Sequence, residues 1–231
     1  MTGTESPLHP FHLIAADGRR LRGDQLIGQD RQILFITGFL SKRWGSKSKA
    51  LMEWCQARGW GFACFDFRGF GDSDGRWGDY TLRHWVEDAQ AVTRLLRDGP
   101  PLTIVGNSLG SWLAWLVAQE QPIVEELILI APAFNMMRVR AEQIPAERRA
   151  RWHASGALPW DDDPLHTNWP IAWQWVEDSD ALWARTFSPL RRVKTTILHG
   201  LQDTVILPNG SWSFVQEVLA RDAGFPIQAL F

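Results

Sequence analysis

The sequence is poor in cysteine and tyrosine, with two and one of them in 231 residues, and it has no long apolar run. No segment approaches the roughly 20 apolar residues of a membrane-spanning helix, which excludes a membrane span. Two cysteines, Cys55 and Cys64, are too few for a disulfide framework, so we interpret them as reduced core thiols of a cytoplasmic protein. The first ten residues, M-T-G-T-E-S-P-L-H-P, lack the apolar segment of a secretory signal peptide.

Neither sign of charge predominates either: the chain has 24 basic and 26 acidic residues, so its net charge is −2. Such a balance gives no general attraction to nucleic acid or to anionic membranes. Hydrophobic residues make up 45% of the chain and charged ones 22%, as in an ordinary globular protein. We expect one α/β domain over residues 1–231. The 14 tryptophans favour core packing, with an aromatic acyl pocket as the alternative.

The most informative stretch runs from Leu102 to Gln119 and reads L-T-I-V-G-N-S-L-G-S-W-L-A-W-L-V-A-Q. It begins as a buried strand and continues with the apolar spacing of an amphipathic helix. Between them lies G-x-S-x-G, with Ser108 at its centre, the pattern of a sharp turn that exposes a strained nucleophilic serine. A tight turn with an incidental serine is the alternative, which the position between strand and helix disfavours.

Strands and helices alternate along the rest of the chain, which predicts a mostly parallel sheet covered by helices on both faces. A hairpin is expected over 11–21, strands over 32–37, 61–67, 126–131, 194–198 and from about 226, and helices over 48–58, 81–97 and 211–220. Residues 133–188 interrupt this pattern with a basic amphipathic helix over 138–152, a loop over 160–164 and a tryptophan-rich helix over 171–183. We interpret this insertion as a lid over the site.

Three motifs together resemble the α/β-hydrolase fold family: G-N-S-L-G at 106–110, D-F-R-G-F-G-D-S-D-G at 66–75 and H-G-x-x-D-x-x-x-x-P at 199–208. More narrowly, F-I-T-G-F-L-S, G-S-K-S-K-A and I-P-A-E-R-R-A resemble ABHD10-like serine esterases and thioesterases. The resemblance covers the chain from Phe11 onward and implies an α/β-hydrolase fold that needs no cofactor and no metal.

The resemblance also implies roles for individual residues. Ser108 would be the nucleophile and Asp203 the acid that orients the base, since the family order is serine, acid, histidine. A solvated turn aspartate is the alternative for Asp203. The backbone N–H groups of Leu109 and, by resemblance, Phe39 would form the oxyanion hole. The remaining carboxylates are weaker candidates: Asp66 and Asp72 are expected to brace the glycine-rich loop, and Asp178 and Asp180 lie in the insertion.

The histidine of this arrangement is expected roughly 30 residues after Asp203, beyond the last strand. The sequence stops at Phe231, within the segment predicted to be that strand. We therefore expect the C-terminal end of the fold to be incomplete and the catalytic histidine to be missing. A helix that usually closes the fold would be missing too, which predicts exposed apolar sheet surface and a possible homo-oligomer.

Other histidines offer weaker alternatives for the base. His199 ends a strand and is expected to brace the backbone, and His84 falls on the exposed side of its helix. His153 and His166 lie in the insertion, from which one of them could reach Ser108.

These features favour a serine hydrolase that cleaves a small hydrophobic ester or thioester through an acyl-enzyme on Ser108. Two alternatives stay open: a truncated, inactive hydrolase that binds a ligand, and a haloperoxidase or C–C bond hydrolase, which shares the turn and the triad.

Overall fold

An eight-stranded sheet forms the centre of the computed structural model, which describes residues 8–159, 169–188 and 190–231. The strand order is β1-β2-β4-β3-β5-β6-β9-β10, and all neighbours from β4 to β10 are parallel. The strands are β1 (Leu8–Ile14), β2 (Arg20–Leu26), β3 (Gln32–Ile36), β4 (Gly61–Asp66), β5 (Leu102–Asn107), β6 (Val124–Ile130), β9 (Lys194–Leu198) and β10 (Ile227–Leu230). The predicted α/β-hydrolase architecture is thereby confirmed.

The antiparallel part of the sheet is the predicted hairpin. β1 pairs with β2, and β2 pairs antiparallel with β4. The turn between β1 and β2 contains Gly18, whose φ of 80° lies in the left-handed region that glycine occupies without strain. The predicted turn at Asp17-Gly18 is therefore correct.

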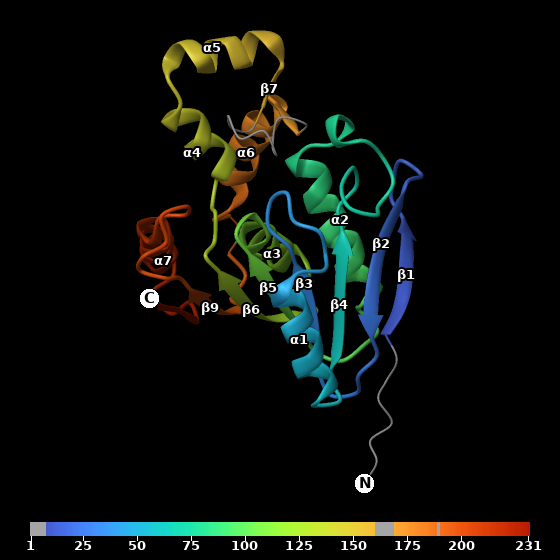
Figure 1. The fold of residues 1–231 in the computed structure, drawn as a ribbon. Coiled ribbons are helices and arrows are strands. Elements are labelled where there is room, and N and C mark those ends of the chain that lie inside the picture. Colours follow the sequence, from blue (N-terminus) through green and yellow to red (C-terminus); the bar gives the residue numbers. More distant parts are fainter. Residues whose placement is uncertain (1–7, 160–168, 189) are drawn as a thin grey trace.

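Helices cover both faces of the sheet, as predicted. The side chains of β3 point alternately to the two faces, into a separate core on each side. Ile33 and Phe35 point into a small core with Cys55 of α1 (Ser46–Gln56), whereas Leu34 and Ile36 point into the main core. The main core also contains apolar residues of α2 (Leu82–Leu95), α3 (Leu109–Glu120) and α7 (Pro208–Arg221). Figure 1 shows α1 in front of the sheet, with α2 and α3 behind it.

Two details of the predicted helices are wrong. The helix α3 was expected to bury one stripe, but every residue from Leu109 to Ala118 is buried, because the sheet, α2 and the end of the insertion enclose it. In α1, the spacing of Leu51, Trp54 and Cys55 predicts that all three face inward, but Trp54 is 40% exposed and packs edge-on against Trp60.

The insertion forms a helical cap above the carboxyl ends of the strands (Figure 1). Its elements are α4 (Met136–Gln143), α5 (Ala146–Ser155), β7 (Ala157–Pro159), β8 (Pro170–Ala172) and α6 (Gln174–Arg185). The single helix predicted over 138–152 is wrong, because Ile144 is extended before Pro145 and the chain turns there. The helix predicted from 171 begins at Gln174, after β8. The loop expected over 160–164 lies outside the described residues.

One face of the sheet retains an apolar groove of about 430 Å³ beside α1, between β3, β5 and β6. Ile33, Val105 and Ile128 line its floor, and Trp54 and Trp60 line its wall. Leu198 and Leu230 are exposed as well. Apolar side chains of β9 and β10 are thus exposed, whereas the link of such exposure to a missing helix and the oligomeric state both stay predictions. Across the described ranges, no helix is both long enough and apolar enough to cross a membrane.

Candidate active site

Ser108 occupies the turn between β5 and α3, as the G-x-S-x-G motif predicts. Its φ and ψ are 55° and −123°, a strained backbone conformation for a residue other than glycine. The residue is only partly buried, although both Gly106 and Leu109 beside it are buried. Ser108 therefore lies at the carboxyl edge of the sheet and not in the core.

The two glycines of the motif are needed because backbones approach each other closely at both positions. A Cβ atom on Gly106 would lie 2.5 Å from the Cα of Ser111, inside the first turn of α3. A Cβ atom on Gly110 would lie 2.3 Å from the carbonyl oxygen of Thr37, at the end of β3. Any larger residue would push α3 away from its own strand or from the neighbouring one.

The strained turn is held by the adjacent strand β6. The N–H of Ser108 donates to the carbonyl of Ile130 at 2.8 Å, and the carbonyl of Ser108 accepts from the N–H of Ala133 at 3.1 Å. Ala131 also has a positive φ, of 44°, as does Leu40 after β3, with 52°. Strained residues therefore follow three neighbouring strands at one edge of the sheet, which is a feature of functional sites. No sequence pattern indicated strain at Leu40 or Ala131.

Asp203 follows β9 at the same edge, two strands from Ser108 in the sheet order. Its Oδ1 accepts hydrogen bonds from the N–H groups of Val205 and Ile206, both at 2.9 Å. The N–H of Ile206 contributes most to holding the pKa of the Asp203 carboxyl below its ordinary value of 3.8. Asp203 is thus an ionised carboxylate at neutral pH, and its side chain is 25% exposed.

His199 braces this loop, as the sequence predicts. Its Nε2 lies 2.8 Å from the carbonyl oxygen of Ile206, and its Nδ1 lies 2.7 Å from Oγ of the buried Ser211. Because a carbonyl only accepts, Nε2 carries the proton and Nδ1 accepts from the Ser211 hydroxyl. His199 therefore holds the backbone between Asp203 and α7, and both of its ring nitrogens are engaged.

The proposed oxyanion groups lie on either side of Ser108. Leu109 is the first residue of α3, where a backbone N–H has no acceptor within the helix. On the other side, a Cβ atom on Gly38 would lie only 3.1 Å from Cβ of Ser108, so the loop after β3 passes directly beside the serine. Phe39 is the next residue in that loop.

The ring of Phe39 packs in the core, in addition to any backbone role. It lies 5.6 Å from the ring of Trp77, in the short helix η1 (Trp77–Asp79), and 5.5 Å from that of Trp175 in α6. Both contacts are edge-on, which is the favourable geometry for aromatic pairs. The helical cap and the loop after β3 are therefore in direct contact.

Asp66 and Asp72 brace the glycine-rich loop, as predicted. Asp66 accepts the N–H of Asp72 at 3.0 Å, and the hydroxyl of Ser73 donates to the carbonyl of Asp66 at 2.6 Å. The sequence did not indicate Arg43, which joins this cluster from the loop after β3: its backbone N–H donates to Oδ1 of Asp66 at 2.6 Å. Only the register of β3 against β4 brings these loops together.

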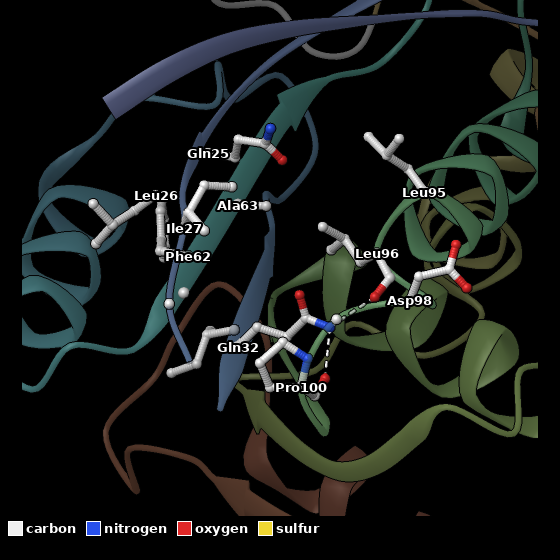
Figure 2. Close-up of a pocket in the computed structure, with 14 residues that line it drawn as sticks. Gln25, Leu26, Ile27, Gln32, Phe62, Ala63, Leu95, Leu96, Asp98 and Pro100 are labelled. Carbon is white, nitrogen blue, oxygen red and sulfur yellow. Dashed lines mark hydrogen bonds between the residues drawn. The ribbon is translucent and has the colours of Figure 1, made fainter. Parts of the chain in front are cut away.

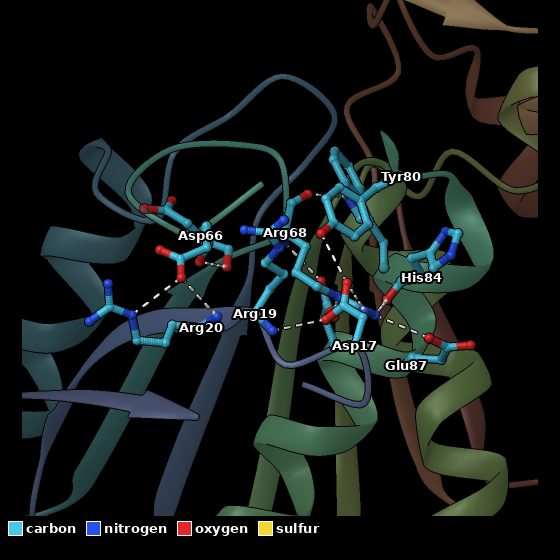
Figure 3. Close-up of polar contacts among 12 residues, drawn as sticks. Asp17, Arg19, Arg20, Asp66, Arg68, Tyr80, His84 and Glu87 are labelled. Carbon is cyan, nitrogen blue, oxygen red and sulfur yellow. Dashed lines mark hydrogen bonds and ion pairs between the residues drawn. The ribbon is translucent and has the colours of Figure 1, made fainter. Parts of the chain in front are cut away.

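Arg68 lies in the same loop but holds different elements. Figure 3 shows its side chain between Asp17 of the hairpin turn and Glu87 of α2. The guanidinium is 2% exposed and also bonds Asp88, whose side chain is fully buried, at 2.6 Å. Burial raises the pKa of the Asp88 carboxyl, and the charge of Arg68 and its hydrogen bonds oppose that rise. This cluster stabilises the loop away from Ser108.

No hydrogen bond joins Ser108 to a histidine in the described part of the chain. His9 and His12 belong to β1, and β2, β4 and β3 lie between that strand and β5. His84 Nδ1 accepts the N–H of Thr81 at 3.0 Å, and His153 packs edge-on against Trp173 within the lid. His166 lies outside the described residues.

Cavities lie at both edges of the sheet. One of about 200 Å³ adjoins the serine turn and is lined by Gly38, Asn107, part of the loop after β3 and the first residues of α1. Another of about 220 Å³ lies at the amino ends of β3 and β4, where the buried amide of Gln32 donates to the carbonyls of Leu96 and Pro100 (Figure 2). The second cavity is at the edge opposite Ser108 and carries none of the predicted site residues.

Comparison with known proteins agrees with this geometry. The model of the alpha/beta hydrolase family matches residues 33–226. Human palmitoyl-protein thioesterase ABHD10, mitochondrial, is 29% identical over 203 residues, and its bovine counterpart is 27% identical over 202. Each match covers 86% of this chain and 65% of the relative, so the chain spans about two thirds of the length of these curated relatives.

Solved structures give the same fold. Mouse alpha/beta hydrolase domain-containing protein 10 superposes with a TM-score of 0.78 at 26% identity, covering 96% of this chain and 87% of that one. Est1E from Butyrivibrio proteoclasticus, solved with ferulic acid, has a TM-score of 0.75 at 20% identity over 95% of this chain and 88% of its own, a likeness of fold alone. With its sheet, its serine turn and a family match over most of its length, the chain belongs to the alpha/beta hydrolase family.

Proposed function

We propose that this protein is a serine hydrolase that cleaves a hydrophobic carboxylic ester or thioester through an acyl-enzyme on Ser108. The conformation of Ser108 carries the proposal: a strained serine between β5 and α3, at the edge where Leu109 begins a helix. A serine that is only structural would gain nothing from a positive φ, which costs about 1–3 kcal/mol. The names of the ABHD10 relatives favour a thioester over other acyl compounds.

The proposed reaction uses groups at one edge of the sheet. Oγ of Ser108 attacks the acyl carbonyl carbon, and the N–H groups of Leu109 and Phe39 stabilise the negative charge that forms on the carbonyl oxygen. The thiolate or alcoholate then leaves with the proton that Oγ gives up, and water attacks the acyl-enzyme, releasing the acyl group as a carboxylic acid and restoring the Ser108 hydroxyl. Asp203, ionised at neutral pH, would stabilise the cation of an imidazole base.

Turnover by this chain is expected to be slow, because no histidine in its described part is placed to take the proton from Ser108. Loss of one triad member commonly leaves about 10³–10⁴-fold acceleration over water. Added imidazole should therefore raise the rate of p-nitrophenyl ester and acyl-thioester hydrolysis well above its effect on free substrate.

Ser108→Ala tests the proposal directly. The variant should lose both the enzymatic rate and labelling by a fluorophosphonate, with an unchanged circular dichroism spectrum. An acyl adduct on intact wild-type protein, found by mass spectrometry and absent from the variant, would identify the nucleophile. Equal rates for the two proteins would refute the proposal and leave the inactive ligand-binding alternative.

Fast turnover without imidazole would point to a base within the lid. His153→Ala and His166→Ala would then distinguish the two candidates.

The compartment stays a prediction as well. The buried free thiols of Cys55 and Cys64 suit a reducing compartment, which we interpret as the cytoplasm. The names of the ABHD10 relatives offer the mitochondrion as the alternative.

A further inference from the structure

We infer that Arg43, held by the buried carboxylate of Asp66, is a positioning residue of the oxyanion hole. The inference rests on the proposed function, because it concerns the loop that carries the N–H of Phe39. Arg43 itself is not expected to touch the substrate. It fixes the position of the loop relative to Ser108.

The loop between β3 and Arg43 is short and strained. The hydroxyl of Thr37 donates to the carbonyl of Ser41 at 3.0 Å, and the N–H of Ser41 donates to the carbonyl of Gly38 at 3.3 Å. Leu40, at the tip, has a φ of 52°. Such a conformation persists only where the surrounding structure imposes it. The loop therefore needs an anchor beyond its own hydrogen bonds.

Arg43 supplies that anchor through both its backbone and its side chain. Its N–H donates to Oδ1 of Asp66 at 2.6 Å, and its Nη1 bonds Oδ2 of the same carboxylate. Nη1 also bonds Asp72 at 2.7 Å, and Nε bonds Asp24 of β2 at 2.7 Å. Burial on its own would lower the pKa of Arg43, but the three carboxylates raise it above the ordinary value. The guanidinium thus stays charged.

Asp66 makes this anchor rigid. Its side chain is fully buried at the end of β4, and that of Arg43 is 14% exposed. Charged hydrogen bonds in such a place are stronger than those at the surface. Asp66 also accepts the N–H of Asp72, and a Cβ atom on Gly71 would lie 2.3 Å from its carboxyl carbon. One carboxylate therefore connects the oxyanion loop, the glycine-rich loop and the central sheet.

The consequence is kinetic. An oxyanion donor stabilises the transition state only at the correct distance, and removing one donor costs about 10²–10³-fold in kcat. Replacing Arg43 would leave the ring contacts of Phe39 in place but would remove the three ion pairs that Arg43 makes. The N–H of Phe39 would then sample other positions. Because Arg43 is not expected to touch the substrate, KM should change little.

The test compares Arg43→Met with Arg43→Lys and with a control, Arg20→Gln. Arg20 lies in β2 and bonds Asp74 of the same glycine-rich loop at 3.2 Å, but not the oxyanion loop. With p-nitrophenyl butyrate as substrate and imidazole present, we expect Arg43→Met to lower kcat about 10–100-fold and to leave KM within about 3-fold. Arg43→Lys should fall between this variant and wild type, and Arg20→Gln should stay within about 2-fold of wild type.

A second readout is independent of turnover. Hydrogen–deuterium exchange of the peptide over 37–43, followed by mass spectrometry, should speed up in Arg43→Met and not in Arg20→Gln. Unchanged kcat or unchanged exchange in a folded Arg43→Met would overturn the inference; if that variant does not fold, Arg43→Lys is judged by the same criterion. Failure of the proposed function has a different signature, namely full activity of Ser108→Ala, and the exchange measurement still decides the role of Arg43.

Discussion

The backbone of Gly110 lies against the carbonyl oxygen of Thr37 so closely that a Cβ atom would approach that oxygen to 2.3 Å. The same atom would lie 2.4 Å from the carbonyl oxygen of Ile36. This contact joins the first turn of α3 to the end of β3. Only a glycine at position 110 therefore lets the start of α3, with the Leu109 N–H, lie this close to the loop that carries Phe39.

We predict that Gly110→Ala is destabilising, by about 1–3 kcal/mol, because backbone atoms must move to admit the methyl group. The matched control is Gly210→Ala, also within a helix, where no atom lies within 4 Å of the added Cβ. There the smaller entropy of the unfolded chain should stabilise the fold by about 0.4–1 kcal/mol. Urea unfolding of both variants should give changes of opposite sign, and a gain for Gly110→Ala would contradict the close contact.

A second prediction concerns the pH dependence of stability through Asp203. Its folded-state pKa is below 3.8 because the N–H groups of Ile206 and Val205 bind the ionised carboxylate. A group with a depressed pKa contributes stability above its unfolded pKa, and this contribution is lost as pH falls through the folded pKa. Asp203→Asn should therefore lower Tm at about pH 7, and the gap to wild type should close below about pH 3. A gap of constant size between these pH values would show that the backbone hydrogen bonds do not depend on the charge.

A third prediction compares two acidic neighbours of Arg68. Asp88 is fully buried and accepts from both the backbone N–H and Nε of Arg68, at 2.9 and 2.6 Å, whereas Glu87 is 52% exposed. Asp88→Asn leaves a buried cation without its principal counter-ion and should cost about 3–5 kcal/mol. Glu87→Gln should cost less than about 1 kcal/mol, since solvent already screens that pair. Equal losses in guanidinium unfolding would mean that burial does not govern the strength of these ion pairs.

Local patterns sufficed to predict the elements that build the site. The apolar run before Gly106 and the change of period after Ser108 identify the strand and the helix, and the structure has β5 and α3 there. The turn at Asp17-Gly18 could be predicted from the Asp-Gly pair alone. Pro145 also indicates the break between α4 and α5, but the basic amphipathic spacing continues across this proline and favoured a single helix.

Features that depend on tertiary contacts could not be predicted in this way. Arg43 gains its role from Asp24, Asp66 and Asp72, which lie 19, 23 and 29 residues away and meet it only through sheet register. The burial of α3 on all sides likewise depends on the insertion, whose last residues contact it. Spacing within one segment carries no information on such partners.

The end of the insertion is fixed to α3 by Thr186, and this contact supports a fourth prediction. Thr186 is fully buried; its hydroxyl accepts from Nε1 of Trp112 at 3.0 Å and donates to the carbonyl of Leu182 at 3.0 Å. Its carbonyl accepts from Nε1 of Trp115 at 2.8 Å. Thr186→Val keeps the shape and the backbone bond but leaves the Trp112 N–H without its acceptor. Burying an unsatisfied donor costs about 1–3 kcal/mol.

A double-mutant cycle separates this cost from loss of packing. Trp112→Phe removes the donor together with part of a buried ring, so it is destabilising on its own. Once the donor is absent, however, Thr186→Val should cost less than in the wild-type background, because nothing is left unsatisfied at the indole position. Guanidinium unfolding of the four proteins should give a coupling energy of about 1 kcal/mol or more between the two positions. Strict additivity of the two stability losses would instead mean that the Trp112 N–H finds another acceptor when the hydroxyl is removed. The end of the insertion would then be held to α3 by the hydrogen bond from Trp115 and by packing.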